Sequence, residues 1–415
     1  MVIASVSAPA GEAGVTIMTT AEEEEGGEWE WAEVDADGVY VVDLRASRAP
    51  RRVCGWPAFA FNRDVSGASH GIGEARAQAR AELRRKLHEA VRLRVSNIPC
   101  PPPLVDSYTD SDSDSAVAQE RVAVLFSGGI DCTLLACLIH DVLPPTEPVA
   151  LVNVAFENPR SVEAYAKTMK TNGHSPDAPS SAYDRCPDRL TGLSSFAELQ
   201  RVAPQRTWKL ICVNVPYAEF LAHKDQVASL MHPHNTEMDL SIAIALYFAA
   251  RGQGVLFGDD TQKPYTTPAR VLISGLGADE LFGGYTRHAT AFTRNGASGL
   301  VEELELDILR IGKRNLGRDD RVISHWAREV RFPFLDESVV SWALALPWWQ
   351  KCSFGMETPT EDGTCLEPGK HILRLLAVEL LMPGVAREKK RAIQFGARTA
   401  KMTSGKTKGT QSVLG

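Results

Sequence analysis

The 415-residue chain is long enough for one large domain or two ordinary ones, and its 44% hydrophobic content suits a globular protein with a sizeable core. Its formal net charge of −7 argues against a surface that coats nucleic acid. The eight cysteines form no Cys-x-x-Cys pair, no His/Cys cluster has zinc spacing, and no apolar run is long enough to cross a membrane. We therefore expect reduced thiols, no secretory signal and a soluble cytoplasmic protein.

The first part of the chain predicts a disordered segment followed by a β-hairpin. Residues 1–28 contain small residues and then acids and glycines, a composition typical of disorder. In residues 29–45, Asp37-Gly38 is a hairpin-turn signal, and the sequence VYVVDL after it predicts the returning strand.

An amphipathic helix is predicted over residues 73–95, where apolar residues recur every four positions at Leu83, Leu87, Val91 and Val95. Prolines then prevent the helix from continuing. The region 100–120 contains the polar run DSYTDSDSDS and predicts a linker insertion, whose serines could accept phosphate, although an unmodified loop is favoured. A second loop is expected over residues 157–195, which are rich in Ser, Pro, Asp and Gly.

Alternating strand and helix patterns predict an α/β fold with a doubly wound parallel sheet. The expected helices are residues 132–142 and 238–251, and the pattern after residue 286 is mostly helical. Four short apolar runs suit buried parallel strands: residues 122–126, 148–156, 209–215 and 269–275.

The first strand ends in Ser127-Gly128-Gly129-Ile130-Asp131, and a helix is expected to begin there. Glycines let a backbone bend sharply and approach a ligand, and a helix start favours phosphate. Asp131 supplies an oxygen ligand for Mg²⁺, the usual companion of a triphosphate. The alternative is an ordinary turn between strand and helix, and no Gly-Lys-Ser/Thr follows as in a Walker A loop.

A second loop of the same kind lies in LISGLGADELFGGY, residues 272–285. A strand again ends in Ser-Gly, and Gly277, Asp279 and Glu280 follow within a few residues. Two parallel strands present their carboxyl ends at one edge of a sheet, which is where open α/β folds bind ligands. Two such loops favour a phosphate site over two unrelated turns.

Two further segments are ambiguous when they are considered alone. Glu329 could orient Arg331, but an exposed salt bridge between them is the more common arrangement. Residues 387–402 carry a basic cluster that resembles a solvated tail. Beside a triphosphate, a lysine from this cluster could neutralise developing negative charge.

Together these motifs resemble the synthetase domain of the asparagine synthetase family, and most closely its domain-containing subgroup. SGGIDC resembles the SGGxDS loop of N-type ATP pyrophosphatases, and SGLGADELFGGY is similar to the second loop of the family. The blocks DR, E-x-R and PFLD follow in order over residues 320–336, while DRLTG, NLGRDDRV and AIQFGARTAKM resemble the subgroup in particular. The resemblance implies an α/β fold of the adenine nucleotide alpha hydrolase-like type over residues 73–402, followed by a disordered tail over residues 403–415.

The resemblance also implies a reaction. ATP would activate the side-chain carboxylate of aspartate as an acyl-adenylate with release of pyrophosphate, and ammonia would displace AMP to give asparagine. By resemblance, Asp131 and Asp279 are catalytic and bind Mg²⁺, Lys390 is the catalytic lysine, and Glu329 and Arg331 are orienting residues. The residues that would contact ATP are Phe126, Ser127, Gly128, Gly129, Cys132, Val154, Ser274, Gly275 and Gly277.

Several residues depart from the family pattern. Residue 2 is Val2 instead of a cysteine nucleophile, so residues 29–70 are expected to be a remnant of an amidotransferase-like domain, and the chain a short form without glutaminase activity. Leu276 replaces a glutamate that is thought to act as a base toward ammonia, and leucine cannot take a proton. Cys132 replaces the loop serine with a weaker donor, and Ala243 stands where the family has an arginine.

These observations leave three functions open. The leading one is an ATP-dependent, amide-forming ligase that acts on the small molecules ATP, aspartate and ammonia. The second is a nucleotide-binding pseudo-synthetase or scaffold with little activity, which Leu276, Cys132 and the missing nucleophile favour. The third is another acyl-adenylating enzyme that acts on a different carboxylate or on tRNA, and only the basic C-terminal cluster favours it.

Overall fold

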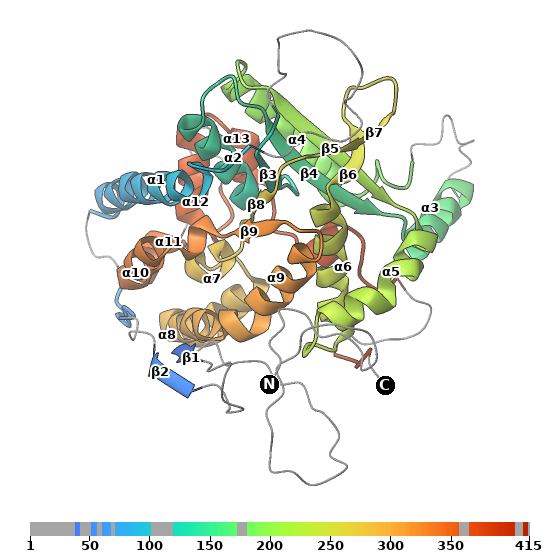
Figure 1. Cartoon of the computed structure of the whole chain (residues 1–415). Helices are drawn as coiled ribbons and strands as arrows, with labels where there is room; N and C mark the ends of the chain where they lie inside the picture. Colours follow the sequence, from blue (N-terminus) through green and yellow to red (C-terminus); the bar gives the residue numbers. More distant parts are fainter. Residues whose placement is uncertain are drawn as a thin grey trace.

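The computed structural model describes residues 38–41, 51–55, 60–67, 71–100, 119–171, 181–356, 365–402 and 410–413. Its centre is a seven-stranded sheet with helices on both faces, in the strand order β7-β6-β5-β4-β3-β8-β9 (Figure 1). The strands are β3 Val122–Leu125, β4 Val149–Phe156, β5 Trp208–Val215, β6 Gln253–Leu256, β7 Pro264–Thr266, β8 Val271–Ile273 and β9 Glu329–Arg331.

Five neighbouring strands of this sheet, from β5 to β9 in the spatial order, run parallel. The chain builds outward from β3 through β4 to β5 and then returns to place β8 on the other side of β3. The four predicted strands and the doubly wound fold are therefore confirmed. The antiparallel edge strands β6 and β7 were not predicted, because they are only four and three residues long and β7 begins with a proline.

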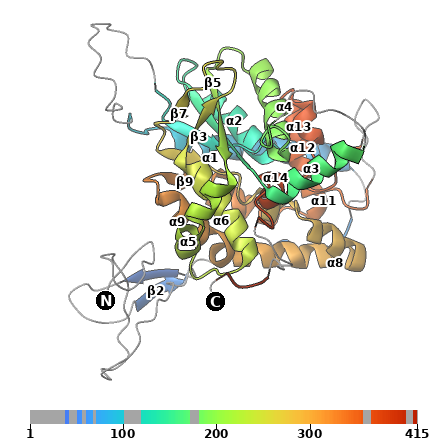
Figure 2. The same cartoon turned by 90° about the vertical axis from the view of Figure 1, so that its right-hand side faces the viewer.

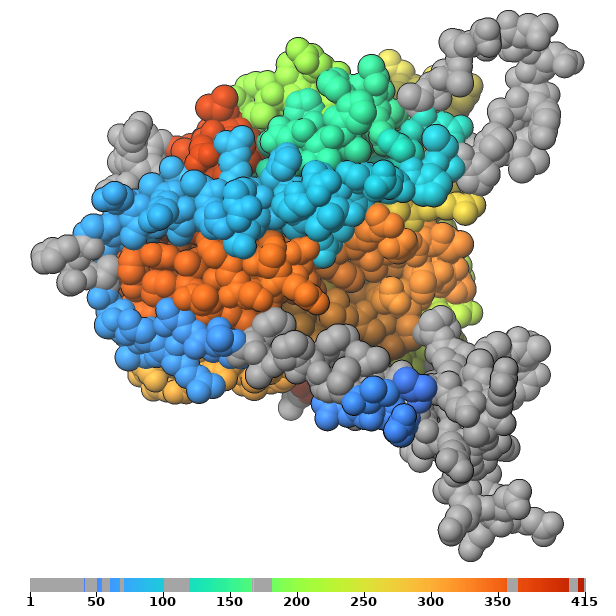
Figure 3. All heavy atoms as spheres, turned by 60° about the vertical axis from the view of Figure 1, so that its left-hand side comes forward, coloured from blue at the N-terminus to red at the C-terminus, as the bar shows by residue number. Residues whose placement is uncertain are grey.

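One face of the sheet and a first group of helices share a core that includes Val122 and Val124 of β3 and Leu83 and Leu87 of the N-terminal helix. Figure 3 shows this helix, in blue, lying along the orange C-terminal half of the chain. The prediction of a helix over residues 73–95 is confirmed within one residue. The helices of this core are α1 Ile72–Val95, α2 Ile130–Val142, α4 Pro187–Val202, α7 Ala278–Phe282, α10 Glu337–Ala345, α12 His371–Glu379 and α13 Pro383–Arg387.

The opposite face carries a second core, to which β3 contributes Ala123, the residue between the two valines that face the first core. Its helices are α5 Tyr217–Leu230, α6 Glu237–Arg251, α9 Gly317–Ser324 and α14 Ile393–Gly396. A third, smaller cluster joins α8 Thr286–Ile311 and α11 Trp348–Lys351. The π-helix η2 Gly312–Leu316 precedes α9, and the 3-10 helix η3 Pro333–Leu335 precedes α10.

The predicted loop over residues 157–195 is wrong, because most of its described part is helical. Helix α3 spans Pro159–Thr171, and α4 begins at Pro187. Proline is favoured at the first position of a helix, where its missing N–H costs nothing, and Asp188 in the next position suits the same turn. Pro159, Pro187 and Asp188, which contributed to the loop prediction, thus lie in the first turns of these helices, and residues 172–180 of the predicted loop lie outside the described residues.

A separate two-stranded antiparallel sheet pairs β1 Gly38–Val41 with β2 Arg51–Gly55 and lies apart from the main sheet (Figure 2). The predicted returning strand is thus a strand, but the partner that the structure describes lies downstream of it. The predicted upstream strand, the disordered segment 1–28 and most of the linker over 100–120 lie outside the described residues.

Residues 60–67 pack on the main body of the protein. The backbone N–H of Asn62 donates to the carbonyl of Leu344 at 2.8 Å, and Arg63 donates to both carboxylate oxygens of Glu305. Within the described ranges, no helix is both long and apolar enough to span a membrane.

Candidate active site

The two predicted glycine-rich loops meet at the carboxyl edge of the sheet. Strands β3 and β8 are parallel neighbours with Val124 opposite Ile273, so the loops that follow them leave the sheet side by side. The direction of chain building reverses between these two strands, and such switch points bind ligands in open α/β sheets. A cavity of about 280 Å³ opens here and is lined by both loops.

The first loop has a backbone that only glycine accommodates at its second position. Gly128 has a φ of +81°, and a Cβ atom there would lie 2.5 Å from the backbone of Gly192 in α4. The Ser195 hydroxyl of the same helix donates to the Gly128 carbonyl at 2.6 Å. Ser127, Gly129 and Asp131 line the cavity at the N-terminus of α2, where unpaired N–H groups can bind an anion.

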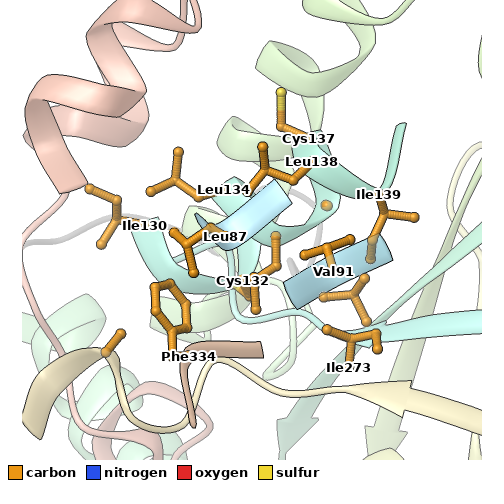
Figure 4. Close-up of a cluster of buried hydrophobic side chains, with 14 of the residues drawn as sticks. Leu87, Val91, Ile130, Cys132, Leu134, Cys137, Leu138, Ile139, Ile273 and Phe334 are labelled. Atoms are coloured by element: carbon orange, nitrogen blue, oxygen red, sulfur yellow. The ribbon is translucent and has the colours of Figure 1, made fainter. Parts of the chain in front are cut away.

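Cys132 does not line this cavity. Its thiol donates to the Gly129 carbonyl at 3.2 Å and lies 3.7 Å from the Ser127 hydroxyl. Figure 4 shows Cys132 among apolar side chains that include Leu87 and Phe334. The residue predicted to contact ATP through its side chain therefore packs into the core and supports the loop from behind.

The second loop is supported by β9 and η3. The Ser274 N–H donates to the Arg331 carbonyl at 3.0 Å. Gly277, with a φ of +100°, lies against Leu335, where an added Cβ would be 2.5 Å from the leucine side chain. Ser274, Gly275 and Leu276 line the cavity, and Gly277 caps the short helix α7 that carries Asp279.

A buried lysine joins the two loops. The Nζ atom of Lys370 lies 2.7 Å from Asp131 Oδ2 and 2.8 Å from Asp279 Oδ1, and only 2% of the lysine side chain is exposed. Lys390 pairs with the other oxygen of Asp279, and its ammonium lies over the ring of Tyr285. All five residues line the cavity.

The charges of this cluster are mutually stabilised. Burial alone would raise the pKa of Asp279, but the ammonium groups of Lys370 and Lys390 together lower it below its usual value. Burial would likewise lower the pKa of Lys370, but Asp131 and Asp279 raise it above the usual value. At neutral pH Asp279 and Lys370 are therefore held together in their charged forms.

Lys390 was predicted from the sequence as a lysine of the site, whereas Lys370 was not predicted. Lys370 is the N-cap of α12 and has a left-handed φ of +54°. A lysine is electrostatically unfavourable at a helix N-terminus. The position of this lysine, after Pro-Gly and before an apolar helix, was therefore the sequence feature that could have indicated a functional role. Gly284 makes room for the cluster, because a Cβ there would lie 2.7 Å from the lysine Cε.

The pair Asp131 and Asp279 fits a magnesium ion that arrives with a triphosphate. Both carboxylates approach the same Lys370 ammonium within 3.0 Å, so they converge on one region of the cavity. Among the described residues, no group of three or more His, Cys, Asp or Glu side chains could hold a metal by itself. Mg²⁺ in nucleotide enzymes is commonly bound by one or two carboxylates, with phosphate oxygens completing its coordination.

The cavity also has an apolar part. Phe126 and Val154 are buried at the carboxyl ends of β3 and β4 and line it, as predicted for residues that border an adenosine. Further apolar lining residues, which the sequence did not single out, are Leu125, Val152, Ile242 and Leu246. The cavity therefore combines an apolar wall with a phosphate-type loop and a charged cluster.

The DRLTG segment, residues 188–192, braces the first loop. Arg189 is buried and donates to the Asn153 Oδ1 atom at 2.7 Å. Asn153 in turn donates to the carbonyl of Phe126 at 2.9 Å and to that of Asp188 at 2.8 Å. With Gly192 packed on Gly128, the segment fixes the loop backbone to α4.

Glu329 and Arg331 form a salt bridge 2.8 Å long, with 63% of the glutamate side chain exposed. This is the exposed salt bridge that the sequence favoured, and Arg331 also donates to the Arg94 carbonyl. Neither residue is among those that line the cavity. The contribution of this segment to the loops comes from the backbone of β9.

The comparisons with known proteins agree with this geometry. The asparagine synthase family profile matches residues 292–409. Asparagine synthetase domain-containing protein 1 of Bos taurus is 39% identical over 341 residues, which cover 78% of this chain and 52% of that protein. The chain belongs to the asparagine synthetase family. The resemblance identified from the sequence motifs is thus confirmed.

A fungal relative extends the match. Asparagine synthetase domain-containing protein YML096W of Saccharomyces cerevisiae is 43% identical over 295 residues, which cover 69% of this chain and 49% of that protein. The asparagine synthetase-family chain thus spans about half the length of the curated relatives it matches. Family membership is consistent with the α/β fold and with the convergence of the two loops.

Proposed function

We propose that this chain is an ATP-dependent, amide-forming ligase that activates the side-chain carboxylate of aspartate as an acyl-adenylate. Ammonia then displaces AMP and gives asparagine. The observation that carries the proposal is the convergence of Asp131, Asp279 and Lys370 between two glycine-rich loops. Such a cluster suits the transfer of a nucleotidyl group, in which negative charge builds on departing pyrophosphate.

The apolar wall formed by Phe126 and Val154 would hold the adenosine. The backbone N–H groups of the first loop would bind phosphate oxygens, and Lys370 and Lys390 would neutralise charge on the pyrophosphate. Asp131 and Asp279 would hold Mg²⁺, which when bound screens the negative charge of the triphosphate. In the first step these groups would position the aspartate carboxylate for attack on the α-phosphorus of ATP. In the second step AMP is the good leaving group that the mixed anhydride supplies to the attacking ammonia.

Leu276 favours a second function, a nucleotide-binding protein with little synthetase activity. Leu276 lines the cavity at the position where the family resemblance implies a glutamate base. A protein of this kind would bind ATP without releasing pyrophosphate, and Leu276→Glu would raise its turnover.

The test incubates the purified full chain with ATP, Mg²⁺ and ammonia, with and without aspartate, and measures pyrophosphate and asparagine. We expect aspartate-dependent pyrophosphate and an equal amount of asparagine, and no asparagine when glutamine replaces ammonia. Asp279→Asn should abolish both products, because it removes a carboxylate that holds the cation. Absence of aspartate-dependent pyrophosphate, with ATP binding retained, would favour the pseudo-synthetase.

A further inference from the structure

A carboxyl group outside the charged cluster faces the same cavity. Asp188 lies in the first turn of α4, only 7% of it is exposed, and it lines the cavity. No residue in the described part of the chain forms a hydrogen bond or ion pair with its carboxylate. A buried carboxylate without a partner costs folding free energy, which a bound cationic ligand would offset.

The position of Asp188 is fixed by its surroundings. Its backbone carbonyl accepts a hydrogen bond of 2.8 Å from Asn153, the same amide that binds the Phe126 carbonyl before the first loop. On its other side is Gly396 of α14, where an added Cβ would lie 2.0 Å from the Asp188 Oδ1 atom. The carboxylate is therefore held beside the phosphate-type loop.

Electrostatics make this carboxylate a proton acceptor near neutral pH. Burial raises the pKa of Asp188 to about 7, and the facing side chains Arg391 and Lys390 limit the rise. Asp319, another buried carboxylate of the cavity, differs because Arg318 donates to it at 2.9 Å. Asp188 thus combines access to the cavity with a free carboxylate.

We propose that Asp188 binds the ammonium ion that supplies the amide nitrogen and accepts the proton whose loss makes it nucleophilic. The proposal rests on the synthetase function proposed above and supplies a base in a cavity where Leu276 cannot act as one. A carboxylate is the natural ligand of a small cation, and no lone pair is available on ammonium until a proton has left.

The step balances as follows. Ammonium gives one proton to the Asp188 carboxylate and becomes ammonia. The nitrogen lone pair forms a bond to the acyl carbon of the adenylate, and the C–O bond to phosphate breaks with its electron pair on AMP. The attacking nitrogen then loses a second proton to water, which leaves the amide.

The experiment compares the full chain with Asp188→Asn in three assays: aspartate-dependent ATP–pyrophosphate exchange, asparagine formation with ammonium chloride, and hydroxamate formation with hydroxylamine. Hydroxylamine is a much weaker base than ammonia and is largely unprotonated at neutral pH. We expect the ammonium-dependent rate of the variant to fall about 100-fold at pH 7, as for loss of a general base. Exchange and the hydroxylamine rate should stay within a few-fold, and raising the pH should restore the ammonium rate.

Asp319→Asn is the matched control and should leave the ratio of the two amine rates unchanged. Equal loss of both amine rates in Asp188→Asn would overturn the proposal and indicate a structural role. A raised KM for aspartate in the exchange assay, with an unchanged ratio, would overturn it in favour of binding to the substrate α-ammonium group. Absence of exchange in the unmodified chain would refute the proposed function itself, and this inference with it.

Discussion

Lys370 holds two carboxylates of the cavity through one ammonium group, since its Nζ lies within 3.0 Å of both Asp131 and Asp279. The three side chains come from different elements, α2, α7 and the start of α12. Their mutual neutralisation allows charged groups to be buried at a sheet edge, where desolvation otherwise opposes ionisation.

Lys370→Met should destabilise the protein, because it leaves two nearby carboxylates without their shared cation. Loss of one member of a buried ion pair costs about 3–5 kcal/mol, and we expect a loss near the lower figure because Asp131 is partly exposed. Urea unfolding at pH 7.5 measures this loss in the free energy of unfolding. Lys389→Met, a change at an exposed lysine, is the control and should shift the free energy of unfolding by less than about 0.5 kcal/mol. Equal effects of the two changes would contradict the account.

Asp188→Asn should stabilise the protein above neutral pH. The folded-state pKa of Asp188 is about 7 against an ordinary value of 3.8, so between these values the unfolded chain ionises while the folded chain keeps its proton. The cost of ionising the buried group therefore grows from pH 4 to pH 7 and reaches at most about 4 kcal/mol. Urea unfolding from pH 4 to pH 8 should show a higher free energy of unfolding for the variant than for the unmodified chain, and this difference should disappear toward pH 4. A gain independent of pH would contradict this.

At the scale of elements, the first loop depends on its contact with α4. The backbones of Gly128 and Gly192 touch, and the Ser195 hydroxyl binds the Gly128 carbonyl. Arg189 and Asn153 hold the start of α4 to the sheet. The DRLTG segment therefore braces the loop through the backbone of Gly192 and the side chain of Arg189.

Gly128→Ala should lower the free energy of unfolding by at least about 2 kcal/mol and weaken ATP binding. The left-handed conformation alone costs a residue with a Cβ about 1–2 kcal/mol, and the methyl group would also collide with Gly192. Gly129→Ala is the matched control for stability, because its φ is −63° and its Cβ would meet only the Ser127 hydroxyl at 3.4 Å. If the two variants unfold alike, the loop does not depend on this approach of the two backbones.

At the scale of the whole molecule, the sheet and both loops could be predicted from the sequence, because apolar runs and glycine-rich strand ends are local patterns. Lys370 could not be assigned, since it meets Asp131 across 239 positions of the chain. A role for Asp188 could not be predicted for a related reason. Its segment resembles a loop in the sequence, and only tertiary packing places it beside Gly396 of α14. Cys132 belongs to the predicted loop, but which way its side chain points depends on the packing of α1 against α2.

The sheet order also explains why these distant residues meet. Strand β8 returns to the side of β3 opposite β4, so the loops after β3 and β8 share one edge. The C-terminal helices α12 and α13 then pack on the first core and bring the preceding Lys370 and the following Lys390 to that edge. The proposed chemistry is therefore a property of the assembled sheet and C-terminal helices.

The most direct test of an acyl-adenylate in this cavity follows the oxygen of the substrate. Aspartate labelled with ¹⁸O in its side-chain carboxylate is incubated with the full chain, ATP, Mg²⁺ and ammonia, and the products are examined by mass spectrometry. The account predicts one ¹⁸O atom in the phosphate of AMP and one in the amide of asparagine. Unlabelled AMP, or label that appears in inorganic phosphate with ADP, would contradict it.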